Sequence, residues 1–172
     1  MMWFRVVFLV VSCYLGYILF AVHDEDIDVP ARVPMFRAMS ISGKSVTEED
    51  ILPDGVIYFF RSSCAYCLLE LPVWQEIREK YPAIKIMAVL HKESISDARE
   101  FFLLHDNPFD YVVEDTNSQL WHGLGARSTP EAFILKEGQV IGHLGYMRYG
   151  PHTLYRKLDK LGGADFASII SS

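Results

Sequence analysis

Cysteine is scarce in this chain, with three among 172 residues, and lysine and arginine form no cluster. Three cysteines are too few for a disulfide-stabilised scaffold, so the fold has to rest on an apolar core. The net charge of −6 and the scattered basic residues argue against a nucleic-acid partner. Internal repeats and low-complexity tracts are also lacking. Because 51% of the residues are apolar, we expect one packed domain with a short N-terminal appendage.

The longest uncharged apolar segment is residues 6–22. At 1.5 Å per residue, about 17 residues is the short end of the length that crosses a bilayer. Arg5 precedes the segment and acidic residues follow it. We therefore expect residues 1–23 to be an uncleaved, single-pass membrane anchor whose basic flank stays in the cytoplasm. Residues 24–34 would be a linker, and the rest of the chain would face outward.

Three other interpretations of this segment are weaker. A cleavable signal peptide is the main alternative, but no convincing small-x-small site precedes the acidic stretch. A lipoprotein site at Cys13 is disfavoured because the apolar run continues well past that residue. A buried core helix fits poorly with a position at the N-terminus. We expect Cys13 to behave as a small buried hydrophobe without a redox role.

Residues 35–163 are predicted to form one α/β domain, followed by a tail at 164–172. The pattern predicts a hairpin with strands around 35–39 and 45–46, buried strands at 56–60, 84–90 and 132–135, helices from about Cys64 and at 94–105, 117–124 and 152–161, and a turn at Glu137-Gly138 before a strand that ends near Leu144. Pro72 should kink the first helix. Strands separated by helices and completed by a hairpin indicate a three-layer α/β/α domain with a mixed central sheet.

Two of the cysteines form the motif Cys64-Ala65-Tyr66-Cys67, between a predicted buried strand and a predicted helix. The first turn of a helix has unpaired backbone donors and the positive end of the dipole, which stabilise a thiolate. We therefore expect a lowered pKa for Cys64, the nucleophile of a redox-active pair. Cys67 lies three positions along the same helix face, where it can resolve a mixed disulfide with a client protein.

Two plainer interpretations of the motif are disfavoured. A structural zinc site usually needs four ligands, and neither a second C-x-x-C nor a histidine pair is available. A pair of inert helix cysteines fits poorly with a motif at a helix start in an oxidising compartment. We expect neither a metal nor another cofactor.

A second candidate element is Ser128-Thr129-Pro130-Glu131, directly before a predicted strand. A cis Thr129–Pro130 peptide would present the backbone of Thr129 beside the thiols, ready to pair with an extended client segment. An ordinary proline leading into the strand fits the sequence equally well.

These motifs together resemble those of the DsbE/CcmG branch of the TlpA/ResA-like thioredoxins. The matching residues are the C-x-x-C with Glu70-Leu71-Pro72, the segment 125–131 (GARSTPE) and the segment 142–145 (GHLG), and the likeness covers roughly residues 30–160. The resemblance implies a thioredoxin fold with an N-terminal hairpin, anchored in the bacterial inner membrane with its soluble domain in the periplasm. It further implies a reductase of apocytochrome c cysteines that takes electrons from a membrane thiol transporter of the DsbD/CcdA type.

The same resemblance suggests roles for single residues. Pro130 would be the cis-proline, and Glu131 the acid beside the active site that tunes the thiols and moves protons. The plain alternative for Glu131 is a solvated surface charge. Two positions depart from the family: Ser63 stands where tryptophan is usual, and Ala65-Tyr66 replaces the common proline-containing dipeptides. Client specificity is therefore expected to differ.

Tyr58 occupies the strand position where thioredoxins carry a buried acid. The proton-transfer role is then left to Glu131 or Glu70, and we rank Glu131 first. Glu70 fits equally well as a helix-surface carboxylate. Trp74 and Trp121 are expected to be packing residues.

Three functions follow. The first is the reductase of cytochrome c maturation. The second is a broader periplasmic disulfide exchanger with other clients, motivated by Ser63 and Tyr66. The third is a copper carrier that uses both thiolates and a histidine such as His143 or His122. The spacing disfavours it, because copper carriers of this fold generally resemble a C-x-x-x-C pattern.

Overall fold

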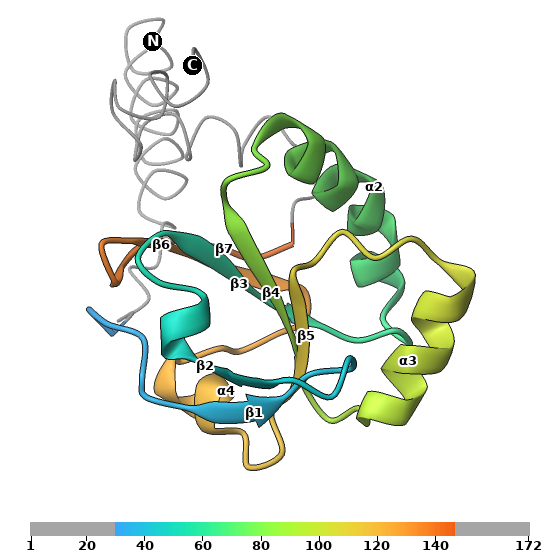
Figure 1. Ribbon diagram of the computed structural model, residues 1–172, viewed down its shortest axis with the longest axis horizontal. Helices are drawn as coiled ribbons and strands as arrows, with labels where there is room; N and C mark the ends of the chain where they lie inside the picture. Colours follow the sequence, from blue (N-terminus) through green and yellow to red (C-terminus); the bar gives the residue numbers. More distant parts are fainter. Residues whose placement is uncertain (1–29, 147–172) are drawn as a thin grey trace, which may run out of the picture.

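A computed structural model describes residues 30–146 of the chain (Figure 1). The elements are β1 (Arg37–Met39), β2 (Ser45–Thr47), the 3-10 helix η1 (Glu48–Asp50), β3 (Gly55–Phe60), α2 (Ala65–Lys80), β4 (Lys85–Leu90), α3 (Ile95–Leu104), β5 (Tyr111–Glu114), α4 (Gln119–Gly123), β6 (Glu131–Lys136) and β7 (Gln139–Leu144). The expected anchor, most of the linker, the expected helix at 152–161 and the C-terminal tail lie outside these residues. Within 30–146, none of the helices combines the length and apolarity needed to cross a membrane.

The central sheet has the strand order β5-β4-β3-β6-β7. β3 pairs in parallel with β4 and antiparallel with β6, so the sheet is mixed as predicted. All six residues of β3 are buried, which matches its continuous apolar sequence GVIYFF. β6 and β7 form a hairpin through Glu137 and Gly138, both with positive φ. The motif with Cys64 and Cys67 comes shortly after β3 in the chain, at the start of α2.

The two faces of the sheet are covered by different elements (Figure 1). Alternate residues of β3 point to opposite faces of the sheet. Val56, Tyr58 and Phe60 belong to a core with α2 and α3. Ile57 and Phe59 belong to a core with the β1–β2 region and α4. Trp74 of α2 is fully buried in the first core, as expected for a packing residue. The three-layer arrangement predicted for the domain is therefore present in the described residues.

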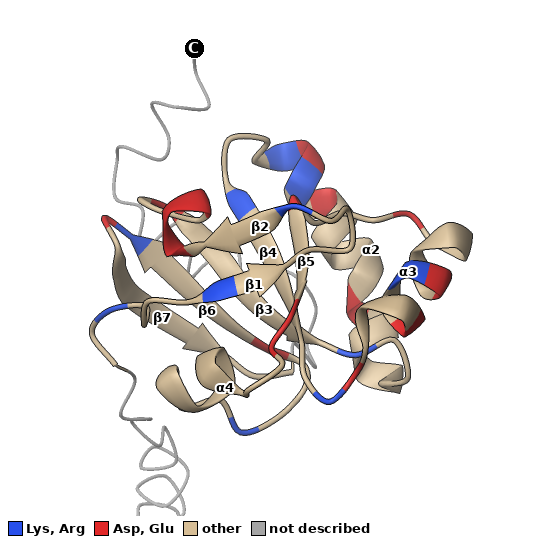
Figure 2. Cartoon of the chain, turned by 60° about the horizontal axis from the view of Figure 1, so that its bottom comes forward, with Lys and Arg blue, Asp and Glu red and all other residues tan. Residues whose placement is uncertain are grey.

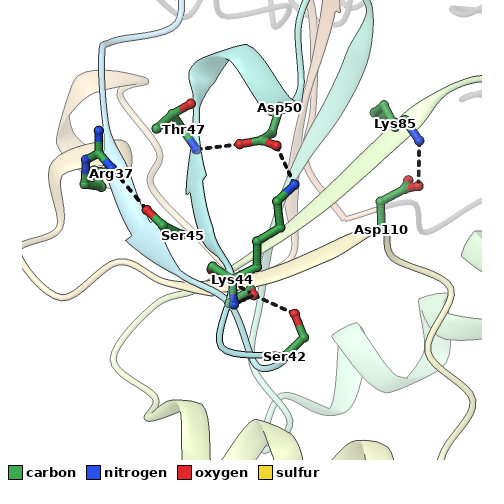
Figure 3. A network of polar contacts seen from close by, with 9 residues as sticks. Arg37, Ser42, Lys44, Ser45, Thr47, Asp50, Lys85 and Asp110 are labelled. Atoms are coloured by element: carbon green, nitrogen blue, oxygen red, sulfur yellow. Dashed lines mark hydrogen bonds and ion pairs between the residues drawn. The ribbon is translucent and has the colours of Figure 1, made fainter.

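The small β1–β2 hairpin is tied to the following helical turn by polar contacts (Figure 3). Lys44 Nζ pairs with Asp50 Oδ1 at 2.7 Å, and the Thr47 amide donates to Asp50 Oδ2 at 3.0 Å. The hairpin therefore packs as an extension of the domain, as the resemblance implied.

Charged residues are also spread over the rest of the domain. Beside the sheet, Lys85 pairs with Asp110 at 3.2 Å. In the view of Figure 2, basic residues lie on several separate elements among acidic ones.

β5 is the one strand of the described region that the sequence analysis missed. It has four residues and is flanked by Asp110 and Asp115, so its pattern is short. Parallel pairing with β4 from Met87 to Leu90, and a bridge from Ser40 to Val113, hold it at the sheet edge. A strand this short is made by its neighbours, because an isolated four-residue segment cannot satisfy its own backbone.

Candidate active site

Cys64 is the N-cap residue of α2, in the loop that leaves the carboxyl end of β3. Its Sγ accepts a hydrogen bond from the Cys67 amide at 3.4 Å and is only partly buried. Burial raises the pKa of the Cys64 thiol, but hydrogen bonds from the Cys67 thiol and amide, from the Thr129 side chain and from the Tyr66 amide outweigh it. The net pKa is below the ordinary value of 9.0, as the helix-start argument predicts.

Cys67 lies one turn into α2 and is completely buried. Burial raises its pKa strongly, and the hydrogen bond with the Cys64 thiol and the charges of Cys64 and Glu70 raise it further. Both thiols are free in the structure. The pair therefore combines one accessible, easily ionised thiol with one buried thiol that holds its proton.

The Thr129–Pro130 peptide is cis, the alternative that places Thr129 beside the thiols. The Cys64 thiol donates to the Thr129 carbonyl oxygen at 3.4 Å, across 65 residues of sequence. Pro130 directly precedes β6, whose first residue is Glu131. The structure also has a cis Leu52–Pro53 peptide, for which the sequence analysis had no signal.

Glu131 is 2% exposed, so it is not a solvated surface charge. Its Oε2 accepts hydrogen bonds from the amides of Arg127 at 2.7 Å and Ser128 at 3.0 Å, and its Oε1 pairs with His143 Nε2 on β7. Burial raises the pKa of Glu131, but the bonds from His143 and the two amides hold it below the ordinary 4.5. These contacts fix the loop that carries Thr129.

Glu70 is 3% exposed, so the interpretation as a helix-surface carboxylate is wrong. Its Oε2 accepts a hydrogen bond of 2.9 Å from the hydroxyl of Tyr58, which is itself buried. Glu70 is one helical turn beyond Cys67, close enough for its charge to raise the pKa of that thiol. The helix turns Glu70 inward because Cys67, Glu70 and Trp74 share the face of α2 that packs on the sheet.

Glu93 is a site residue that the sequence analysis missed. It lies between β4 and α3, and both its carboxylate oxygens accept from the Ser62 amide at 3.0 Å. The Ser62 hydroxyl also donates to Glu93. These hydrogen bonds fix the position of the loop before Cys64, although Glu93 is 31 residues from Ser62 in the sequence. Nothing in the local sequence signals it, because the contact depends on the pairing of β3 with β4.

The remaining predicted residues lie on the surface around the nucleophile. Ser63 and Ala65 are exposed, and Tyr66 is 56% exposed. The Tyr66 ring lies 4.5 Å from the ring of Tyr146, measured between centroids. We call the exposed pair of Tyr66 and Tyr146 the aromatic rim; the exposed Leu69 lies three residues after Tyr66 on α2. The aromatic rim adjoins Cys64 through Tyr66.

The structure places the histidines considered for copper on β7 and α4. His143 contacts Glu131 and the ring of Phe133, and His122 is an exposed residue of α4. Across residues 30–146, no three His, Cys, Asp or Glu side chains are grouped as metal ligands would be.

Two curated proteins are similar to this chain in sequence. A Pasteurella multocida protein described as thiol:disulfide interchange protein DsbE-2 is 26% identical over 124 residues, which are 70% of this chain and 63% of that relative. The thiol:disulfide interchange protein DsbE of Pseudomonas fluorescens is 23% identical over 147 residues, 81% of this chain and 82% of the relative. This chain resembles DsbE-type proteins. No protein-family model matches it.

Solved structures of a DsbE protein and of a thioredoxin share the architecture. A Chlorobium tepidum protein described as DsbE has a TM-score of 0.69 at 22% identity, covering 80% of this chain and 100% of its own. The exposed lipoprotein thioredoxin of Streptococcus pneumoniae has a TM-score of 0.62 at 25% identity, covering 74% and 99%. The domain therefore has the thioredoxin-like fold. The two curated relatives are, by name, thiol:disulfide interchange proteins.

Proposed function

We propose that this chain is a thiol-disulfide oxidoreductase whose reactive centre is Cys64 and Cys67. The observation that carries the proposal is the pairing of an accessible thiol of lowered pKa with a buried thiol of raised pKa, beside the backbone of Thr129. An asymmetric pair of this kind suits a stepwise exchange, because one sulfur attacks the client and the other stays protonated until it attacks the mixed disulfide. The names of the DsbE-type relatives point to the same chemistry.

In the first step, the Cys64 thiolate attacks one sulfur of a client disulfide. A bond forms between Cys64 and that sulfur, the client S–S bond breaks, and the other client sulfur leaves as a thiolate that takes a proton. The Cys67 amide, which donates to Cys64 Sγ, stabilises the attacking anion. The Thr129 carbonyl and the cis-proline loop lie where an extended client backbone could pair with the protein.

In the second step, Cys67 loses its proton and attacks Cys64 Sγ. The Cys64–Cys67 disulfide forms, the mixed disulfide breaks, and the second client sulfur leaves as a thiolate that takes a proton from solvent, which makes the client a dithiol. The two electrons gained by the client are those lost by the two cysteines. The proton must leave a buried thiol, and Glu70, one turn away on the same buried helix face, is the carboxylate we propose as its acceptor. Glu131 instead fixes the loop that carries Thr129, by accepting hydrogen bonds from the amides of Arg127 and Ser128.

The client we propose is apocytochrome c, with the protein reducing its haem-binding cysteines in the periplasm while residues 1–23 anchor it in the inner membrane. A membrane thiol transporter of the DsbD/CcdA type would then return the pair to its dithiol form. Support comes from the resemblance of the motif set and from the DsbE-type relatives. In this function the protein is a reductant with one main client.

The direction of electron flow is tested by the reduction potential of the full-length chain in detergent, equilibrated with glutathione or dithiothreitol buffers. A value of about −270 to −200 mV supports a reductase. A value near about −120 mV contradicts it and indicates an oxidant. A Cys64→Ser variant should show no reducible pair at all.

The client is tested by trapping with Cys67→Ser, which stops the reaction at the mixed disulfide. Capture of apocytochrome c, and loss of c-type haem attachment in a deletion strain, support the proposal. Capture of other proteins alone, with haem attachment intact, favours the broader exchanger. The exposed aromatic rim beside Cys64 is the observation that keeps this second candidate, because an apolar surface at the nucleophile accepts varied client sequences.

A further inference from the structure

Tyr58 is a buried phenol that the reaction described above does not use. It lies in the middle of β3, 1% exposed, with its ring 4.6 Å from that of Trp74 and 5.7 Å from that of Phe109. Packing alone would be served equally well by phenylalanine, as at the neighbouring Phe59 and Phe60. A hydroxyl at this depth costs free energy unless it has a partner. Its partner is the carboxylate of Glu70.

The hydrogen bond from Tyr58 to Glu70 is placed where the second step needs a base. It is 2.9 Å long and buried, and its acceptor follows Cys67 by one helical turn. The phenol can only stay protonated here: burial raises its pKa well above 10, and the charges of Glu70 and Cys67 raise it further. Tyr58 therefore donates a hydrogen bond to the Glu70 carboxylate, and keeps its own proton, through the whole working range of pH.

We propose that Tyr58 is a positioning residue for the reaction, which orients the Glu70 carboxylate toward the Cys67 thiol and stabilises its charged form through the 2.9 Å hydrogen bond. This inference rests on the proposed function, in which Glu70 accepts the Cys67 proton. The proton passes from Cys67 Sγ to a carboxylate oxygen of Glu70 as the Cys67–Cys64 bond forms. The Tyr58 hydroxyl keeps its own proton throughout and fixes the other oxygen. In a buried site, a hydrogen bond from a hydroxyl to a charged carboxylate is stronger than a hydrogen bond between two neutral groups.

The test measures the second step alone, in the full-length chain. Cys64 is converted to its mixed disulfide with thionitrobenzoate, and release of the coloured thiolate by Cys67 is followed at each pH. The titratable groups that interact with Glu70 include Tyr58 on β3 and Cys67 at the start of α2, and Cys67 in turn interacts with Cys64. Cys64 is blocked in this assay, and Tyr58 does not ionise, so the acidic limb of the profile reports Glu70 coupled to Cys67.

In Tyr58→Phe the ring packing is kept and only the donor is lost. We expect the midpoint of the acidic limb to rise by about one pH unit, so that release slows about tenfold at a pH below both midpoints. Replacement of Tyr58 by 3,5-difluorotyrosine, whose phenol is a stronger donor, should move the midpoint the opposite way. Tyr111→Phe on β5 is the matched control, with a hydroxyl removed outside this network and a profile equal to wild type.

A Glu70→Gln background decides whether Tyr58 acts through Glu70. There the acidic limb should be lost, and adding Tyr58→Phe should change the release rate less than twofold. A wild-type profile in Tyr58→Phe, or an equal shift with and without Glu70, overturns the inference. Failure of the proposed function has a different signature: wild-type protein would release thionitrobenzoate normally yet leave client disulfides unreduced.

Discussion

The start of α2 and the start of β6 each place one buried carboxylate near the thiols, and they hold it in opposite ways. At β6, Glu131 is bonded to two backbone amides and to His143, so its charge is used in fixing a loop. At α2, Glu70 receives a side-chain hydroxyl and lies one turn from Cys67. Both carboxylates are buried, yet only Glu70 lies one turn from the thiol that we propose loses its proton. The partners of a buried acid therefore say more about its role than its burial does.

The largest effect we expect is the difference in reactivity between the two thiols. Cys64 has a pKa below 9.0 and is partly exposed, whereas Cys67 is buried with a strongly raised pKa. Alkylation by iodoacetamide at pH 7 should be at least about a thousandfold faster at Cys64, since each pKa unit is about tenfold in thiolate. Peptide mapping by mass spectrometry measures both sites, with denatured protein as the control. Equal rates in the folded protein would contradict the asymmetry.

The next effect separates the two carboxylates by stability. Glu131→Ala leaves two amides and His143 without their buried acceptor, so we expect the free energy of unfolding to fall by about 3 kcal/mol. Glu70→Gln keeps an acceptor for the Tyr58 hydroxyl and should lose less than about 1.5 kcal/mol. Urea unfolding of both variants measures this. A larger loss in Glu70→Gln would reverse the roles that we assign.

The pH dependence of stability sharpens the same comparison. The pKa of Glu131 is lowered on folding, so its contribution is fully present above about 4.5 and is lost as the pH falls through the lower folded value. In Glu131→Gln the stability should therefore decline less steeply below pH 4.5 than in wild type. Asp50 and Asp110 also have lowered pKa values and supply the slope that remains. Thermal unfolding between pH 2 and 6 measures it, and identical slopes would contradict the ionised Glu131.

The smallest effect concerns Glu93, a third carboxylate near the site. It is partly exposed and bonds the Ser62 amide and hydroxyl, so Glu93→Ala should cost about 1 kcal/mol of stability. Because it holds the loop before Cys64 and not the thiol, we expect the pH midpoint of Cys64 alkylation to stay within about 0.3 units of wild type. A larger shift would make Glu93 part of the electrostatic site. Glu79 on the surface of α2 provides the control substitution.

Much of the fold follows from local pattern. The apolar run at 56–60 and the turn at Glu137-Gly138 each predict their element, because burial and left-handed backbone leave direct marks in sequence. The apolar pattern of β5 is too short to predict a strand. β5 forms because it pairs with β4 and because Val113 makes a bridge to Ser40. The helix at 152–161 stays a prediction.

For the site, the sequence by itself determined Cys64 and Cys67. A C-x-x-C between a buried strand and a helix has one geometry, because the helix start places the first thiol at free amides and turns the second inward three residues later. It also brought Thr129, Pro130 and Glu131 forward as candidates. It ranked Glu131 before Glu70 for the proton-transfer role, without access to the contacts that separate the two acids.

The tertiary structure alone decided what each carboxylate does. Glu131 meets its amides only after the loop at 127–129 folds back, and Glu70 meets Tyr58 only when α2 packs on β3. Glu93 reaches Ser62 only because β3 and β4 lie side by side. The physical reason is common to all three. A hydrogen bond acts over about 3 Å, and each carboxylate has a partner that is distant in sequence: Tyr58 for Glu70, Ser62 for Glu93 and His143 for Glu131.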